Sequence, residues 1–239
     1  MKLYAYCLAE AGATLDQSPS GISGAPVRLI KIDNLAVLIS DTNIDAVPVT
    51  RENALAHAAV VRSLLVQTTP LPFRFGTLVT EQQLSNYVSS HKSALEKKLA
   101  HVRGCVEMSV KIIWEAPAGK NTETPNPELQ GAGTTFLAEK QREILGDEQR
   151  AKQAAEVAGW LRAGISGLTR DERVTVRPSE RLLLSAAHLV ERGNIPLYRA
   201  RIVEARKNRP ELHFLVSGPW PPYSFANIEL EFSSQFGVS

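Results

Sequence analysis

The stretch Ser217-Gly218-Pro219-Trp220-Pro221-Pro222-Tyr223-Ser224-Phe225-Ala226 constrains the fold more than any other part of this chain. It follows directly on a β-rich run at residues 212–216. Proline fixes φ and donates no backbone hydrogen bond, so the prolines predict that sheet pairing ends here and that the chain stays extended. The aromatic side chains must pack, because each carries a large apolar surface. We call this stretch the strap and expect a stiff aromatic segment that leaves a sheet.

Three placements of the strap satisfy its need for packing. It can cover the sheet edge of its own domain, or it can cross back to the N-terminal domain and set the angle between the two. It can also dock another protein together with neighbouring exposed apolar residues. None of these residue types is needed at a reacting bond, which favours a structural or binding role.

Upstream of the strap, residues 103–216 alternate strand and helix patterns. Val106 to Trp114 alternates apolar and polar residues, as a half-buried strand does, and Asn194 followed by Pro196 is a good helix start. The expected order is a strand at 106–114, a helix at 135–167, strands at 174–176 and 181–190, a helix from 195 and a strand at 212–216. This β-α-β-β-α-β order predicts a ferredoxin-like domain over residues 103–239, with a Pro/Asn/Thr/Gly-rich insertion at 116–133 and a C-terminal tail that packs back.

Residues 1–102 are predicted to form a separate, mixed α+β domain, so that the fold class is α+β with two domains. A strand is expected at 3–9, and Asp33-Asn34 joins two further strands in a hairpin. In the helix expected at 52–65, the apolar residues Leu55, Ala59, Val60 and Leu64 are interpreted as one face. Pro70 and Pro72 end that helix, and a single helix is expected from 80 to 102.

Composition excludes several classes of protein. The chain has 239 residues, 44% of them hydrophobic, which suffices for a real core, and its net charge of +2 is too small to indicate a polyanion partner. No apolar run approaches the roughly 20 residues of a membrane span. Cys7 and Cys105 are interpreted as reduced thiols rather than a disulfide or redox pair. These features predict a cytoplasmic protein that binds neither nucleic acid nor a membrane.

No pattern in the chain indicates catalysis, a metal site or a cofactor. The five histidines never stand at metal-ligand spacing from Cys, Asp or Glu, and His57, His91 and His188 are expected to be packed or capping residues. Phosphate-binding, GxSxG and GxGxxG loops are absent, and Gly131-Ala132-Gly133 lacks the context of a dinucleotide fingerprint. The ferredoxin-like strands lack the aromatic residues of an RNA-binding platform. We therefore expect a protein that is not an enzyme.

Arg74 is the most unusual charged residue, because it lies between Phe73 and Phe75 and among prolines. An arginine in such surroundings is often partly buried, and Glu52 and Glu81 are candidate partners. A structural role is favoured over partner contact or catalysis.

Three segments resemble one known family, the gas vesicle proteins GvpF and GvpL. They are Pro70 to Thr77 with the helix before it, the glycine-led helix entry Gly131 to Lys140, and Leu215 to Phe225; the strand start Leu3-Tyr4-Ala5-Tyr6 also fits. The three motifs occur in order and span nearly the whole chain. The resemblance implies two α+β domains, the second ferredoxin-like, and no catalytic residue.

The resemblance further implies an accessory protein of gas vesicle formation, a minor structural or assembly component located at this cytoplasmic organelle. Its expected partner is the small hydrophobic shell protein GvpA, together with other gas vesicle accessory proteins. The family-motif residues expected to serve structure or partner binding are Pro72, Arg74, Phe75, Gly76, Thr77, Gly218, Pro219, Trp220, Pro221, Pro222, Tyr223 and Phe225. The alternative is a ligand-sensing ferredoxin-like regulatory module.

Overall fold

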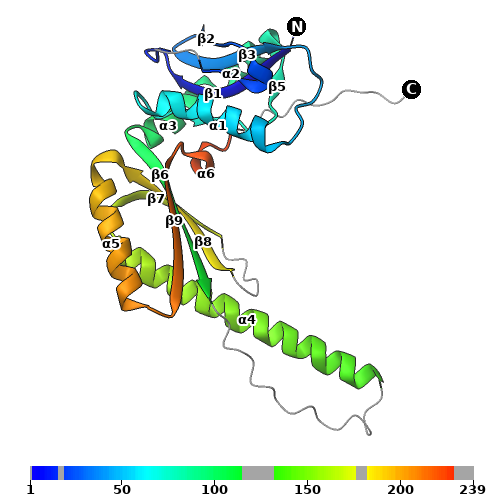
Figure 1. Cartoon of the computed structure of the whole chain (residues 1–239), viewed down its shortest axis with the longest axis vertical. Coiled ribbons are helices and arrows are strands. Elements are labelled where there is room, and N and C mark those ends of the chain that lie inside the picture. The colour runs from blue at the N-terminus through cyan, green and yellow to red at the C-terminus, as the bar shows by residue number, and fades with distance from the viewer. Residues whose placement is uncertain (1, 16–18, 115–131, 176–181, 229–239) are drawn as a thin grey trace. The chain divides into compact units, whose positions relative to one another are not determined.

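The computed structural model describes residues 2–15, 19–114, 132–175 and 182–228 (Figure 1). Contacts between Cα atoms group the chain into two compact units. Unit 1 contains Met1–Glu107 together with the chain from Pro219 onward, and unit 2 contains Met108–Gly218. All but the first two residues of the strap therefore group with the N-terminal residues.

Unit 1 is built on a sheet whose strands run in the order β2-β3-β1-β4, with β5 also paired to β1. Each of the pairings is antiparallel. The expected hairpin at Asp33-Asn34 is confirmed, and Asp33 adopts the left-handed φ of 53° that such two-residue turns require. The strands are β1 (Lys2–Glu10), β2 (Val27–Ile32), β3 (Leu35–Thr42), β4 (Leu71–Pro72) and β5 (Leu78–Val79).

The helices of unit 1 begin at polar caps that the sequence places before them. The Thr50 side chain accepts a hydrogen bond from the backbone N–H of Asn53, and Thr80 and Gln83 form a reciprocal capping box. The single helix expected at 80–102 is wrong, because the chain leaves helical geometry at His91, where φ is −108° and ψ is 12°. The helices are α1 (Arg51–Leu65), α2 (Glu81–Ser90), α3 (Lys92–Val102) and the short α6 (Tyr223–Ala226), with a 3₁₀ turn at Ile22–Gly24.

The central strands of unit 1 are buried on both faces. On one face, Tyr4, Tyr6 and Leu38 pack against Val60 and Leu64 of α1 in a single apolar cluster. Alternate strand residues such as Val37 and Ile39 are equally buried but lie outside that cluster, as expected for side chains that point to the opposite face. α2 contacts β2 and α3, so helices supply apolar cover that a two-faced sheet needs.

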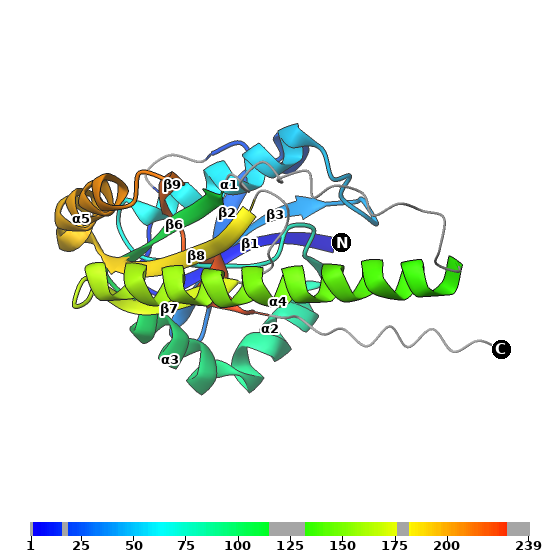
Figure 2. The same cartoon turned by 90° about the horizontal axis from the view of Figure 1, so that it is seen from below.

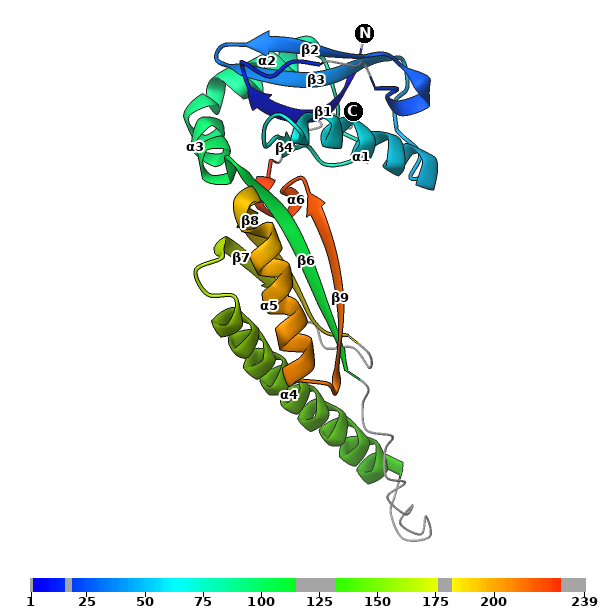
Figure 3. The same cartoon turned by 60° about the vertical axis from the view of Figure 1, so that its left-hand side comes forward.

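Unit 2 contains the second sheet, with strand order β7-β8-β6-β9. The hairpin of β7 and β8 is antiparallel, and α4 and α5 contact each other as well as β8 (Figure 3). Figure 2 shows α4 continuing well beyond the strands. The elements are β6 (Cys105–Trp114), α4 (Ala132–Gly164), β7 (Thr169–Thr175), β8 (Leu182–Glu191), a 3₁₀ turn (Arg192–Asn194), α5 (Ile195–Asn208) and β9 (Leu212–Trp220). The fold is thus α+β with two antiparallel sheets, as predicted at this level.

The end of β9 differs from the expectation that the strap prolines stop the sheet. β9 runs through Pro219 to Trp220 instead of ending near Val216. It lies at the edge of its sheet, where a residue without an N–H removes no second pairing, so a proline is tolerated. Most of the predicted insertion at 116–133 lies outside the described residues; α4 begins at Ala132.

The core of unit 2 confirms the packed role expected for His188. Its Nδ1 lies 2.7 Å from the hydroxyl of Tyr198 on α5, and both side chains are buried. Burial lowers the pKa of His188 to about 4, because the charged imidazolium would lose its hydration. His188 is therefore a neutral hydrogen-bonding core residue at neutral pH.

Candidate binding groove

The motif Pro72–Thr77 is folded against β1. Pro72 continues β4, and the Phe73 backbone N–H donates to the Tyr6 carbonyl oxygen at 2.9 Å. Gly76 has a φ of +85°, which favours glycine, and its N–H donates to the Tyr4 hydroxyl at 3.1 Å. Thr77 closes the turn, since its hydroxyl donates to the Arg74 carbonyl oxygen at 2.7 Å. The motif is a turn held in place by a tyrosine of the sheet.

Arg74 and Phe75 of this motif differ in burial. Arg74 is exposed, so the expectation of partial burial is wrong. Phe75 is half-buried, with its ring centre 5.9 Å from the ring of His57 on α1.

Tyr4 connects the motif to helix α1. Its hydroxyl lies 2.9 Å from Nδ1 of His57, while it also accepts the Gly76 N–H. Which of the two groups donates depends on the tautomer of the imidazole, whose other nitrogen, Nε2, is buried without a hydrogen-bond partner among the described residues. Burial lowers the pKa of His57 to about 4 and raises the pKa of Tyr4 to about 12. The pair is neutral and fixes the inner face of α1 on the sheet.

The outer face of α1 forms one wall of an apolar groove in unit 1. The groove has a volume of about 620 Å³. Leu55 and Val66 stand exposed at its two ends, and small side chains lie between them. From α1 and the strap, the residues lining it are Leu55, Ala58, Ala59, Arg62, Ser63, Val66, Trp220, Pro221 and Tyr223.

This arrangement corrects the single apolar face expected for the helix. Val60 and Leu64 are fully buried, whereas Leu55 and Ala59 are exposed and line the groove. At 100° per residue, Val60 and Leu64 point away from Leu55 and Ala59 by more than a quarter turn. The helix therefore has two apolar sides, of which only one packs on the sheet.

The strap supplies the opposite wall. The guanidinium carbon of Arg62 lies 4.8 Å from the ring centre of Trp220, a cation–π contact that joins the two walls. Trp220 and Tyr223 keep 36% and 40% of their surface exposed, whereas Pro221, Pro222 and Phe225 are buried. The strap therefore anchors itself with some of its apolar residues and presents the others to solvent.

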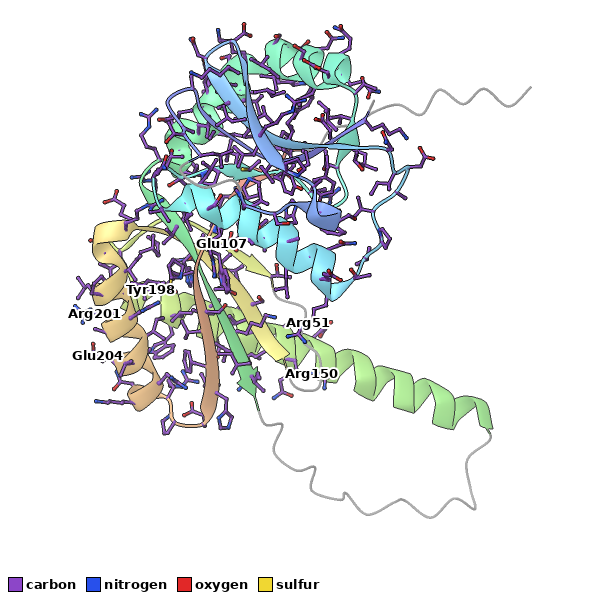
Figure 4. The ribbon with its side chains drawn as sticks, turned by 45° about the horizontal axis from the view of Figure 1, so that its top comes forward. Arg51, Glu107, Arg150, Tyr198, Arg201 and Glu204 are labelled. Carbon is purple, nitrogen blue, oxygen red and sulfur yellow. The ribbon has the colours of Figure 1, made fainter. Side chains whose placement is uncertain are left out.

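A buried carboxylate fixes the strap to the first residues of β6, which belong to unit 1. The backbone N–H and the hydroxyl of Ser224 donate to the two carboxylate oxygens of Glu107 at 2.7 and 2.8 Å. Burial raises the pKa of Glu107, and the two bonds from Ser224 oppose that rise. Figure 4 labels Glu107 on its strand. The Lys98 ammonium also donates to the carbonyl oxygens of Ala226 and Asn227, at 3.1 and 2.5 Å.

The remaining motif residues, Gly218 and Pro219, lie near the start of the strap. Gly218 has a φ of +119°, and its carbonyl oxygen accepts a hydrogen bond from Arg199 at 3.1 Å. Pro219 is exposed at the end of β9. Gly218 and Pro219 do not line the groove, so of the strap residues expected to act at a site, only Trp220, Pro221 and Tyr223 come together there.

Sequence reasoning missed the residues of α1 that complete the groove, and it also missed Glu107. No local signal marks Arg62, Leu55 or Val66 as groove residues, because the other wall is formed by the strap, more than 150 positions further along the chain. Glu107 stands at a polar position of the alternating strand pattern, as Lys111 does, so nothing in the sequence indicated that Glu107 is buried and Lys111 exposed. A buried charged residue must find a partner, which for Glu107 is Ser224.

The chemistry available in the described part of the chain points to binding. Within it, no three His, Cys, Asp or Glu side chains cluster so as to hold a metal ion. The same residues contain no helix with the length and apolar character needed to cross a bilayer. Among the described residues that line the groove, Arg62 is the only charged one. An apolar groove with one cation is suited to binding an apolar segment of a partner.

Comparison with known proteins decides the family. The model of the family "Gas vesicle synthesis protein GvpL/GvpF" matches residues 2–227. The chain belongs to the GvpL/GvpF family. The resemblance seen in its motifs is therefore confirmed. The family is one of gas vesicle proteins, and neither its description nor the names of related proteins indicate an enzymatic activity.

Relatives of both the L and the F type match over most of their length. Gas vesicle protein L2 of Halobacterium salinarum is 26% identical, and the match covers 93% of this chain and 90% of that protein. Gas vesicle protein F1 of the same organism is 24% identical, with 98% and 97% covered.

Solved structures share the fold. The crystal structure of GvpF from Anabaena sp. PCC7120 aligns with a TM-score of 0.77 at 20% identity, covering 95% of this chain and 97% of that one. GvpF from Microcystis aeruginosa gives a TM-score of 0.74 at 21% identity, with 95% and 99% covered. Two antiparallel sheets in two α+β bodies are therefore the fold of GvpF proteins.

Proposed function

We propose that this chain binds the hydrophobic shell protein GvpA through the groove between α1 and the strap and keeps it competent for assembly into gas vesicles. One observation carries the proposal. Of the eight large apolar residues that are exposed in the described part of the chain, four line this one groove: Leu55, Val66, Trp220 and Tyr223. Exposed apolar residues that gather in a groove mark a protein-binding surface more often than a chance cluster.

The physical reason for such a partner is the behaviour of a shell subunit in water. A protein that must form an apolar wall exposes apolar surface before assembly, and that surface drives aggregation. A partner that covers part of it reversibly lowers the concentration of aggregation-prone subunits without blocking their later incorporation. The groove offers apolar contact together with an Arg62 guanidinium at its wall, and such a mixed surface releases its occupant more readily than a fully buried interface.

The same proposal includes where the chain acts. Family membership supports a role at the gas vesicle as a minor structural or assembly component, in company with GvpA and with other gas vesicle accessory proteins. Binding through an open surface groove, without a reactive centre, is consistent with a chaperone-like role.

Co-expression tests this proposal directly. Tagged full-length chain is purified from cells that make GvpA, and we expect the two proteins to elute together and GvpA to stay in the supernatant. GvpA expressed alone is expected to sediment. If GvpA neither co-elutes nor gains solubility, and vesicles form normally without the gene of this chain, the proposed function is wrong.

For unit 2 we infer the ferredoxin-like arrangement. Support comes from its element order β6-α4-β7-β8-α5-β9 and from its sheet order β7-β8-β6-β9, in which each helix connects strands that are not neighbours. An experimental structure that placed β6 at an edge of this sheet would overturn the inference.

A further inference from the structure

The groove has the length and the shape to hold one helix. Its α1 wall is a single stripe of residues spaced by three or four positions, from Leu55 through Ala59 and Arg62 to Val66. The stripe is about 17 Å long at the rise of an α-helix, which corresponds to about three turns. A bound helix of that length would lie along α1 and contact both of the exposed end residues.

The α1 wall has small side chains at its centre and larger ones at its two ends. Ala58, Ala59 and Ser63 provide small side chains between Leu55 and Val66. Small side chains allow two helix axes to approach closely, and larger ones at the ends interdigitate with the side chains of the partner. The exposed rings of Trp220 and Tyr223 then contact the flank of the bound helix.

An extended strand would fit this groove poorly. Strand addition needs unpaired backbone donors and acceptors, but the backbone groups of α1 are bonded within the helix. On the other wall, Pro221 has no N–H to donate. The α1 backbone and Pro221 therefore favour an occupant that satisfies its own backbone, as a helix does.

The polar groups of the groove specify one charge on that helix. Ser63 already donates its hydroxyl hydrogen bond to the Val60 carbonyl oxygen at 2.7 Å, and the Tyr223 phenol is neutral at neutral pH. None of the lining residues that the structure describes is acidic, so Arg62 has no counter-charge among these residues. Stacking on Trp220 uses the flat face of the guanidinium, whereas its five N–H donors lie in its plane. Arg62 can therefore stack on the ring and bind a carboxylate at once.

We propose that the groove binds one amphipathic helix of about three turns, whose apolar face packs on α1 and the strap and whose single carboxylate pairs with Arg62. The proposal rests on the proposed function, because it assigns this helix to GvpA. It defines the kind of segment recognised and the position of its charge.

Site-specific photo-crosslinking separates this inference from the proposed function. A photoreactive phenylalanine derivative replaces Val66 in the groove or, as a matched control, Val49, which is 89% exposed against 83% for Val66 and does not line the groove. The full-length chain is co-expressed with GvpA and irradiated. We expect a GvpA adduct from position 66 that is at least about tenfold stronger than that from position 49, since reaction requires direct contact.

The outcomes distinguish the two proposals. If GvpA co-purifies and forms adducts at position 49 but none at position 66, the groove does not bind the GvpA helix, while the proposed function still stands. Adducts at position 66 to a second copy of this chain overturn the assignment of the groove to GvpA. Failure of GvpA to co-purify at all overturns the proposed function and the inference together. Peptide mapping of a position 66 adduct to a segment without helical periodicity also contradicts the proposal that a helix occupies the groove.

Substitution of Arg62 tests the predicted charge. Binding of the full-length chain is measured with fluorescent GvpA peptides of about 20 residues, long enough to form a helix on the surface. Arg62→Glu is expected to weaken binding at least about tenfold, because it opposes the carboxylate, and Arg62→Lys to weaken it less than about threefold. Val66→Glu is expected to lose binding like Arg62→Glu, whereas Val49→Glu is expected to bind like the unchanged chain. Unchanged or tighter binding by Arg62→Glu would show that no carboxylate meets this arginine.

Discussion

Helix α1 presents two apolar faces, of which one is buried and the other is exposed. The inner face carries His57, Val60 and Leu64, all buried on the sheet, with His57 bonded to Tyr4. The outer face carries Leu55 and Val66, which stay exposed although they are as hydrophobic as their inner counterparts. The difference lies in what the rest of the chain brings to each side. A sheet closes the inner face completely, whereas the strap reaches the outer face along one flank and leaves a groove.

This contrast teaches that burial and apolar character must be judged separately on an amphipathic helix. Side chains on the inner face contribute to the stability of unit 1. Those on the outer face contribute little to stability and are available for binding. Substitutions on the two faces should therefore separate the free energy of unfolding from the affinity for GvpA.

Removal of inner-face volume is expected to have the largest effect on stability. Leu64 is fully buried in the cluster that joins α1 to the sheet, so Leu64→Ala leaves a cavity. We expect a loss of about 2–5 kcal/mol in the free energy of unfolding. Chemical denaturation followed by circular dichroism measures it. A loss below about 0.5 kcal/mol would contradict the assignment of this face to the core.

Loss of the carboxylate that holds the strap should have the next largest effect. Glu107→Ala removes the acceptor for the backbone N–H and the hydroxyl of Ser224, and we expect a loss of about 1–3 kcal/mol. The change should also loosen the strap, which weakens the contact of Trp220 with Arg62. Fluorescence of Trp220, recorded in a variant with Trp114 and Trp160 replaced by Phe, reports that loosening. A spectrum identical to that of the parent would argue against a strap held by Glu107.

Acidification tests the neutral histidine of the inner face. The folded pKa of His57, about 4, lies below the usual 6.5, so the unfolded chain binds this proton first as the pH falls. Stability is therefore complete above about pH 6.5 and falls from there to about pH 4, by about 2 kcal/mol at pH 5 relative to pH 7. His188 is expected to add a similar loss, because its pKa is also lowered to about 4.

Urea titrations at pH 7 and pH 5 measure this difference, and His57→Gln serves as the comparison, since its amide does not titrate and can still form a hydrogen bond with the Tyr4 hydroxyl. The variant is expected to lose part of the pH dependence. An equal pH dependence in the variant and the parent would exclude His57 as a contributor.

Substitution on the outer face should have the smallest effect on stability. Val66→Ser and Leu55→Ser change exposed side chains, so we expect changes within about 0.5 kcal/mol. The same variants are expected to bind GvpA several-fold more weakly. Leu197→Ser on α5 is the matched control, because Leu197 is 50% exposed, Leu55 is 59% exposed, and only Leu55 lines the groove. Equal affinity of the Leu55 and Leu197 variants would remove the groove from the binding surface.

Local sequence signals predicted most of the elements but not how their faces are used. The Asp33-Asn34 hairpin and the start of α5 after Asn194 both depend on neighbouring residues, and both are confirmed, although the Asn194 side chain makes no capping hydrogen bond. The break at His91 was missed, because the apolar pattern of the two helices continues across it. The two faces of α1 were merged for a similar reason, since periodicity describes spacing and does not reveal which side finds a partner.

The family could be identified from the amino-acid sequence, through motifs whose residue types are tied to particular turns and to a stiff aromatic strap. The α+β class could be predicted as well, because strand and helix periodicities are set by residues close together in the chain. The folded structure was needed to find that the strap groups with α1, that Ser224 donates to Glu107 and that Arg62 stacks on Trp220. These contacts join residues more than 100 positions apart, and their geometry follows from the packing of the whole unit, which no local pattern contains.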